Sequence, residues 1–122
     1  MSRQQFPTWV DQPGSCFSVA RVTGANVSAA GQSTAGLDGR GKNFCTIARV
    51  ANAYTVTFLV GYADAPYVTF TPYTSNVAID ALVVTATGMT FNTVQRDSNA
   101  VAVNTPDFTF EVTHFNTVNY VS

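Results

Sequence analysis

The sequence predicts an all-β fold, an antiparallel β-sandwich or jelly roll, and both its composition and its apolar spacing support this. The 122 residues include 17 Val and 17 Thr but only three Leu and two Ile, and β-branched side chains favour pleated strands. Leu, Glu and Lys are scarce, and no 12-residue window repeats apolar residues with the helical period. Turn residues recur about every 8–12 residues, which predicts about seven or eight short strands.

The first 14 residues differ from the rest and are predicted to form an extended N-terminal arm. This segment holds two of the five prolines and the only tryptophan, and it shows no strand alternation. Each proline favours an extended conformation in the residue before it. An alternative, in which Trp9 packs against its own domain, fits the sequence equally well. If the arm binds a partner, its expected contact residues are Phe6, Pro7, Trp9, Val10 and Pro13.

Residues 15–122 are predicted to form a single β-sandwich domain. In the clearest strand, 106–115, aromatic and apolar residues alternate with Thr and Glu, as in a half-buried strand. Prolines at both ends of 66–72 fit either an edge strand or a strand whose length the prolines limit. Residues 116–122 either extend the last strand or add a short one. The segments that carry strand signals are 15–22, 43–50, 51–61, 66–72, 76–87, 89–95 and 106–115.

Two longer segments are predicted to be loops. Residues 23–43 contain five glycines and many Ala and Ser, so their side chains are too small to build a core, although one short strand near Val27 is compatible with them. Residues 96–107 surround a short apolar run and end in turn residues. No repeat or low-complexity linker divides the chain.

The low charge of the chain excludes several classes of partner. Charged residues make up 11% of the chain, against about 25% in typical domains, and the formal net charge is −1. Nucleic-acid and anionic-membrane binders need clustered cations, so neither partner is expected. No apolar run approaches the roughly 20 residues of a membrane span, and the first ten residues show no secretion signal. A surface of Thr, Ser, Asn and Gln could be buried in a large assembly without burying unpaired charges, which is costly. The simpler interpretation is a domain whose solvent-exposed surface is polar and uncharged.

The residues that could carry chemistry do not form a recognisable active site. The only histidine, His114, lies in an aromatic strand, where a packed or hydrogen-bonded core residue is the simpler interpretation. Asp80 interrupts an apolar run, which a β-bulge or a turn between two short strands explains. The Gly-rich segment 36–41 lacks the following helix and the Lys-Ser/Thr ending of a phosphate-binding loop. No carboxylate pair is apparent, so we expect neither enzymatic activity nor a cofactor.

The two cysteines do not indicate a metal site. Cys16 and Cys45 are 29 residues apart, and no second Cys/His pair could complete a tetrahedral set. Two buried free thiols are favoured over a disulfide, although spacing alone leaves the disulfide open.

Four strand and turn motifs resemble those in the small β-sandwich knobs of tailed-bacteriophage virion proteins, in particular the tips of tail fibres. These motifs lie within roughly half of the chain. They are Y-T-V-T-F (Tyr54–Phe58), A-P-Y-V-T-F-T-P (Ala65–Pro72), T-A-T-G-M-T-F (Thr85–Phe91) and D-F-T-F-E-V (Asp107–Val112).

The resemblance implies a homotrimer on the outer surface of a phage particle, made in the host cytoplasm. Only the arm precedes the knob in this sequence, so it looks more like a capsid decoration (cement) protein or a head fibre than a whole tail fibre. Its expected partners are further copies of itself and the major capsid protein, and its expected role is to stabilise the shell. Catalytic residues are not implied.

The alternative is a receptor-binding tip that recognises a host surface glycan or protein. Its contacts would come from residues 23–43 and 96–105 and from the side chains of Tyr62, Tyr67 or Tyr73, because aromatic rings stack on sugars.

Overall fold

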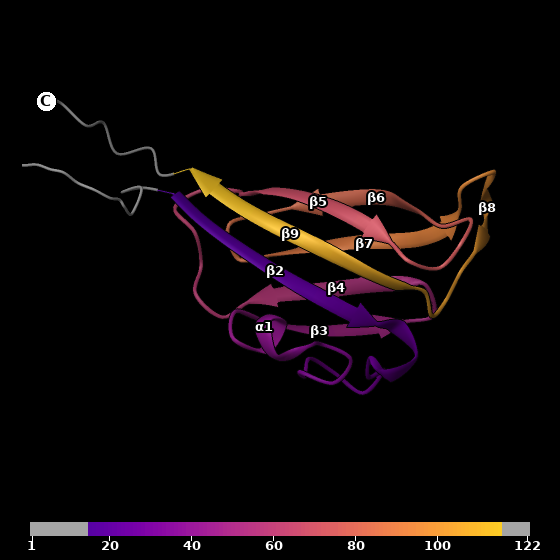
Figure 1. Cartoon of the computed structure of the whole chain (residues 1–122), viewed down its shortest axis with the longest axis horizontal. Coiled ribbons are helices and arrows are strands. Elements are labelled where there is room, and N and C mark those ends of the chain that lie inside the picture. The colour runs from indigo at the N-terminus through magenta and orange to yellow at the C-terminus, as the bar shows by residue number, and fades with distance from the viewer. Residues whose placement is uncertain (1–14, 116–122) are drawn as a thin grey trace, which may run out of the picture.

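Residues 15–115, the part of the chain that the computed structural model describes, form two antiparallel β-sheets packed face to face (Figure 1). The all-β sandwich predicted from the sequence is therefore confirmed. The predicted arm, residues 1–14, lies outside the described residues, as do residues 116–122 and the side chains of Ser15 and Cys16.

In residues 15–115, eight strands build the two sheets. The first sheet has the order β2–β9–β5, which are Ser15–Thr23, Asp107–Phe115 and Tyr67–Pro72. The second has the order β3–β4–β7–β6, which are Cys45–Val50, Ala53–Phe58, Gly88–Gln95 and Ala78–Val84. The short β8 (Ser98–Ala102) pairs with the end of β7. Two short helices lie between β2 and β3, η1 (Gly24–Asn26) and α1 (Gly39–Lys42).

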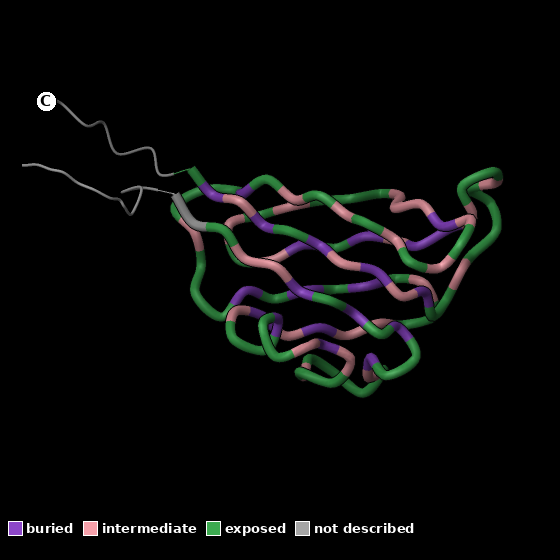
Figure 2. The backbone as a smooth tube through the Cα atoms, in the orientation of Figure 1, coloured by how far each residue is buried: buried purple, intermediate pink, exposed green. Residues whose placement is uncertain are grey.

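The alternation of side chains in the strands fills the space between the sheets with aromatic rings. Burial alternates residue by residue along β4 and β9, as predicted (Figure 2). The ring of Phe91 stacks on Tyr54, with centroids 5.3 Å apart, and contacts Phe108 edge-on at 5.8 Å and Phe70 at 4.9 Å. These four rings come from β7, β4, β9 and β5, so the aromatic cluster joins both sheets.

The predicted loops contain more structure than their sequences indicated. Residues 96–107 contain β8, which pairs with β7 at Ser98 and Ala102. Most β8 side chains are small and exposed, so no buried alternation revealed this strand. Near Val27 the chain forms η1 instead of a short strand, and Val27 is buried as the residue that ends this helix.

The strand is irregular at Asp80, which agrees with a bulge, the first of the two interpretations that the sequence allowed. The register of β6 against β7 shifts between Asp80 and Val83. Ala81, inside the bulge, has a φ of 53°, which is uncommon for a residue with a side chain. Asp80 itself is half-buried, in a strand that pairs with β7 alone among the described strands.

The connection from β2 to β3 closes one side of the sandwich. Asp38 caps α1: its Oδ1 accepts hydrogen bonds from the Gly41 and Arg21 N–H groups at 2.9 and 3.1 Å, and its Oδ2 pairs with Arg40. Burial opposes ionisation, but these hydrogen bonds and the Arg40 charge outweigh it and lower the pKa of Asp38. The Asp38 carboxylate thus occupies backbone donors that a phosphate would require, which argues against a phosphate loop at 36–41.

Two buried groups are held in their neutral form. Cys45 is a free thiol that lies at 3.4 Å from the Gly41 carbonyl oxygen, and burial, with a contribution from the Asp38 charge, raises its pKa to about 12. The Tyr54 hydroxyl donates to the Asn104 carbonyl oxygen at 2.8 Å, and burial raises its pKa to about 12 as well. In the unfolded chain these side chains have their ordinary pKa values, 9.0 for Cys45 and 10.0 for Tyr54.

We therefore expect stability to fall in alkali. Because the folded pKa values are raised, the contribution of Cys45 and Tyr54 is complete below about pH 9 and is lost as the pH rises toward 12. Between its unfolded and its folded pKa, each group lowers the free energy of unfolding by up to about 1.4 kcal/mol per pH unit. Urea unfolding at several pH values in this range measures how steeply the free energy of unfolding falls with pH. The Cys45→Ala and Tyr54→Phe variants should each show a shallower fall. Equal slopes in the wild type and both variants would contradict this assignment.

Candidate interaction surface

Three aromatic side chains form an exposed cluster on the outer surface of the β2–β9–β5 sheet. We call Phe17, Tyr67 and Phe115 the aromatic face. Because the even-numbered residues of β2 and β9 turn inward, odd-numbered Phe17 and Phe115 turn outward. Phe17 and Tyr67 flank Thr113 from the two neighbouring strands, and Phe115 is the next outward residue of β9.

The aromatic face is open to solvent. Its three side chains are 64, 69 and 59% exposed, in the order Phe17, Tyr67 and Phe115. The rings of Tyr67 and Phe115 meet edge-on at 5.9 Å. Single exposed apolar residues are normal, but a contiguous group marks an interaction site. These rings therefore form a candidate contact surface.

The apolar surface continues from the aromatic face around the edge of the sheet. Phe17 and Val19 line a hollow of about 370 Å³ together with Phe44. A second hollow of about 380 Å³ shares Phe44 with it and is bordered by Leu59 and Val60, which are 55 and 80% exposed. The exposed surface thus reaches the connection between β4 and β5.

The aromatic face lies at the end of the molecule from which both outer segments of the chain continue. β2 begins and β9 ends at this end (Figure 1). The predicted contact residues of the arm, Phe6, Pro7, Trp9, Val10 and Pro13, are outside the described residues. Residues 1–14, which are predicted to form the arm, join the described structure at Ser15, two residues before Phe17 of the aromatic face.

The sequence alone did not distinguish the aromatic face from the core. In β2 the small residues Ala20 and Val22 are fully buried, whereas the larger Phe17 is exposed. Size would suggest the opposite orientation, because large apolar residues usually turn inward. Alternation correctly separated the two surfaces of β4 and β9, whereas in β7 the neighbouring residues Thr93 and Val94 are both buried. It could not show which surface of a strand the second sheet covers.

His114 fastens the connection between β4 and β5 to the same end of the sandwich. Its Nε2 lies 2.6 Å from Asp64 Oδ1, and its side chain is only 8% exposed. The imidazole also packs on Tyr62, with ring centroids 5.1 Å apart, and Tyr62 in turn contacts Phe58. The lone histidine is thus a buried, hydrogen-bonded residue, as the sequence indicated.

This cluster lacks the contact that would activate a nucleophile. Ser18 borders the same hollow as His114. Within residues 17–115 no hydrogen bond joins these two side chains, although an activated serine needs one to its base. The same residues hold no group of three or more His, Cys, Asp or Glu that could bind a metal ion. Hydrogen bonding and packing are the roles that this geometry supports for His114.

We expect the His114→Ala variant to loosen residues 59–66 and to leave the two sheets intact. The lost hydrogen bond, discounted because Asp64 is 57% exposed, is worth about 0.5–1.5 kcal/mol. Hydrogen exchange followed by mass spectrometry should show faster exchange in 59–66 and unchanged exchange in β4 and β7. Asp64→Ala should have the same effect, and uniform protection in both variants would contradict the role assigned to this bond.

The tyrosines that a glycan site would use are not equivalent. Tyr62 is half-buried against His114 and Phe58. Tyr73 is exposed, but the Arg21 guanidinium lies over its ring at 4.3 Å, and its hydroxyl accepts a hydrogen bond from Thr109. Tyr67 is the most exposed of the three and belongs to the aromatic face.

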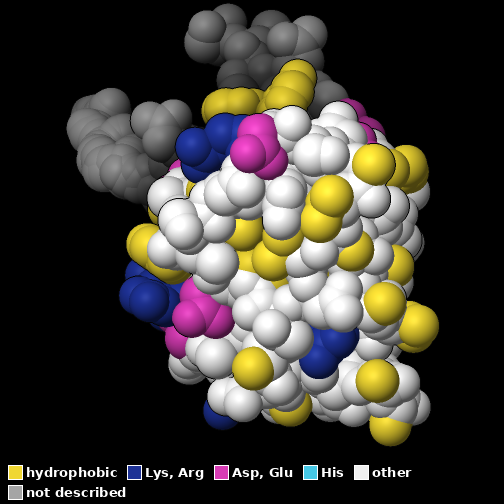
Figure 3. Space-filling view, turned by 90° about the vertical axis from the view of Figure 1, so that its right-hand side faces the viewer, with side chains coloured by type: hydrophobic (Ala, Val, Ile, Leu, Met, Phe, Trp, Pro, Cys, Tyr) yellow, Lys and Arg dark blue, Asp and Glu magenta, His cyan; other side chains and the backbone are white. Residues whose placement is uncertain are grey.

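Charged groups are sparse on the opposite end of the molecule as well. Figure 3, which looks onto the end that carries β8, shows mainly hydrophobic and uncharged groups, with a few positive and negative side chains, some of them side by side. In the described part of the chain, no helix is long and apolar enough to cross a membrane.

No protein-family model matches the sequence, and comparisons with curated proteins and solved structures give no significant match.

Proposed function

We propose that this chain is a bacteriophage structural protein that decorates the outer capsid surface as a homotrimer and stabilises the shell. The observation that carries the proposal is the position of the aromatic face, which lies beside the starting point of the arm. An arm and an exposed aromatic cluster at one end of a sandwich can contact the same partner. Its expected partner is the major capsid protein.

The surface chemistry favours a protein partner. Aromatic side chains are enriched at the centres of protein interfaces, whereas charged residues are depleted there. Fully burying an exposed Phe contributes about 1.5–3 kcal/mol, so three aromatic rings can supply a useful fraction of a binding energy. Few ions must be desolvated, because only 11% of the residues are charged.

The role requires no covalent chemistry. A shell becomes more stable when each bound copy contacts several neighbouring capsid subunits, because separating those subunits then breaks additional contacts. The arm, with Phe6 and Trp9 as its largest apolar side chains, would extend this contact beyond the edge of the sandwich.

The proposal is tested with phage particles whose gene for this chain has been deleted. Purified full-length chain should co-sediment with these particles and raise the temperature at which they release their genome. A variant without residues 2–14 should bind at least about tenfold more weakly, because it lacks the arm's apolar anchors. Failure of the full-length chain to bind would contradict the proposal, whereas undiminished binding of the deletion variant would remove the arm from it.

A receptor-binding tip is the second candidate, and the exposure of Tyr67 favours it. In that case the isolated protein should bind intact host cells, and Tyr67→Ser should weaken this binding. Capsid decoration instead predicts binding to particles and none to cells, so one preparation of protein distinguishes the two functions.

A further inference from the structure

The sandwich has one closed side and one open side. Residues 24–44 close the side between β2 and β3, where Leu37 bridges to Val22 and Ser33 bridges to Ile47. On the other side, within residues 15–115, β5 pairs only with β9 and β6 pairs only with β7. Prolines at positions 66 and 72 border β5, as expected for an edge strand.

An apolar groove of about 340 Å³ lies on this open side. Its floor includes Phe108 and Val77, which are buried, and the half-buried side chains of Phe70 and Ile79 complete its walls. The volume is at the small end of the range for ligand sites, roughly 300–1,000 Å³. The groove can therefore accept one aromatic ring or one branched aliphatic group.

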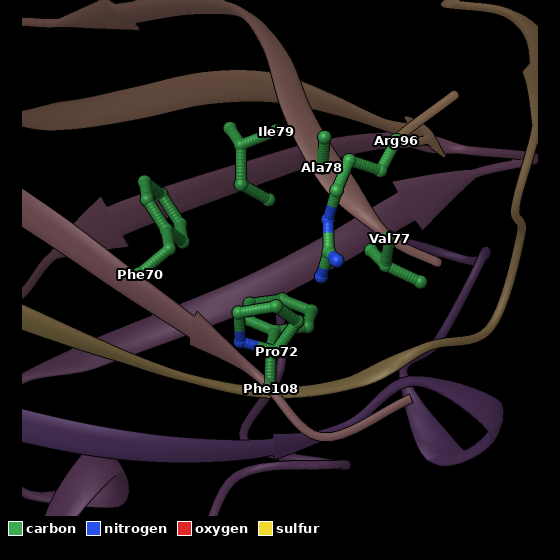
Figure 4. Close-up of a pocket in the computed structure, with 7 residues that line it drawn as sticks. All are labelled: Phe70, Pro72, Val77, Ala78, Ile79, Arg96 and Phe108. Atoms are coloured by element: carbon green, nitrogen blue, oxygen red, sulfur yellow. The ribbon is translucent and has the colours of Figure 1, made fainter. Parts of the chain in front are cut away.

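One cation extends over this groove. Figure 4 shows the Arg96 side chain reaching between Ala78 and Val77 toward Pro72. Within residues 17–115, the Arg96 guanidinium has no carboxylate within ion-pair distance, since the pairs there are Arg40–Asp38 and His114–Asp64. An unpaired guanidinium beside an apolar surface is complementary to a carboxylate.

The backbone around Arg96 is braced. Its N–H donates to the Asn76 carbonyl oxygen at 3.2 Å. The Asn76 side chain donates to Asp97 Oδ1 at 3.2 Å and accepts from the Asp97 N–H at 3.3 Å. The neighbouring carboxylate of Asp97 is thus engaged with Asn76, and the turn that carries Arg96 is tied to the start of β6.

We propose that this groove binds a small monocarboxylate that carries one aromatic or branched aliphatic group. The apolar group lies against Phe70, Ile79 and Phe108, and the carboxylate pairs with Arg96. One guanidinium balances one negative charge, which favours a monocarboxylate over a phosphate ester with two charges. The inference is independent of capsid binding, because it concerns the side of the sandwich between β5 and β6 and not the aromatic face.

The experiment is an NMR titration of the full-length protein with 3-phenylpropionate as the probe. We expect saturable amide shifts at Phe70, Val77, Ile79 and Arg96 in the millimolar range. Two matched compounds separate the parts of the probe: 3-phenylpropionamide lacks the charge, and propionate lacks the ring. Both should bind at least about tenfold more weakly, because each lacks one of the two interactions.

Variants test the assignment of the cation. Arg96→Gln should weaken binding of 3-phenylpropionate by about tenfold, the low end for a hydrogen bond between charged groups, because Arg96 is exposed to solvent. Lys42→Gln removes the same charge from an exposed position outside the groove and should leave the affinity unchanged. Unchanged amide positions elsewhere in the spectrum of each variant show that it is folded.

Three results would overturn the inference. They are the absence of saturable shifts in the wild type, equal binding of the amide and the acid, and equal affinity of the Arg96→Gln variant. A short peptide that ends in Phe should bind no more tightly than 3-phenylpropionate. Much tighter binding of that peptide, lost on amidation of its C-terminus, would make a protein terminus the occupant and would also overturn the assignment of a small molecule.

Discussion

Replacing Phe17, Tyr67 and Phe115 together by serine should weaken binding to gene-deleted particles by at least about 100-fold. Truncation of a buried aromatic at an interface commonly costs more than 1 kcal/mol, so three such losses exceed the 2.7 kcal/mol or so that corresponds to this factor. All three side chains are exposed in the described structure, so the substitutions remove little packing from the core. Co-sedimentation with increasing protein concentration measures the affinity.

The matched control for this experiment changes apolar residues at the other end of the sandwich. Val50 and Val101 are exposed, at the end of β3 and in β8, away from the aromatic face (Figure 1). Their replacement by serine should leave particle binding within about twofold of the wild type. Full binding by the triple aromatic variant, or an equal loss in the valine control, would show that the aromatic face is not the contact surface.

Replacing Phe108 by alanine should remove a large part of the folding stability. Phe108 is fully buried, and its ring contacts Tyr54 at 5.6 Å, Phe91 at 5.8 Å and Phe70 at 6.2 Å. Phe→Ala in a packed core costs about 3–5 kcal/mol, against total stabilities of about 5–15 kcal/mol for small domains. Chemical unfolding gives the change in free energy from the shift in midpoint.

Phe17→Ala makes the same substitution on the surface and is the control for Phe108→Ala. Phe17 lies on the outer side of β2, so we expect its replacement to cost less than about 1 kcal/mol. If Phe108→Ala and Phe17→Ala lowered the free energy of unfolding by similar amounts, Phe108 would not join the two sheets in the way described.

The strands were predictable because their chemistry repeats with the period of a strand. The alternation in β4 and β9 separated their apolar sides from their polar sides, and the prolines at the ends of β5 were compatible with an edge strand. The charged residue within an apolar run indicated a bulge or a turn at Asp80, and the register of β6 shifts there. Each of these features depends on neighbouring residues in the sequence, which a sequence shows directly.

The features that were missed depend on contacts between distant segments. β8 has small exposed side chains, and its pairing with β7 is set by the preceding turn at Arg96 and Asp97. The aromatic face forms because three separate strands place one ring each around Thr113. The groove beneath Arg96 likewise combines β5, β6 and β9, so no single stretch of sequence contains its pattern.

The most direct test of capsid decoration is the number of copies of this chain in a purified phage particle, measured by quantitative mass spectrometry against the major capsid protein. Decoration of a repeating shell predicts hundreds of copies in a fixed ratio to the capsid protein. A handful of copies would instead indicate a tail appendage, and their absence from the particle would contradict a structural role in the virion.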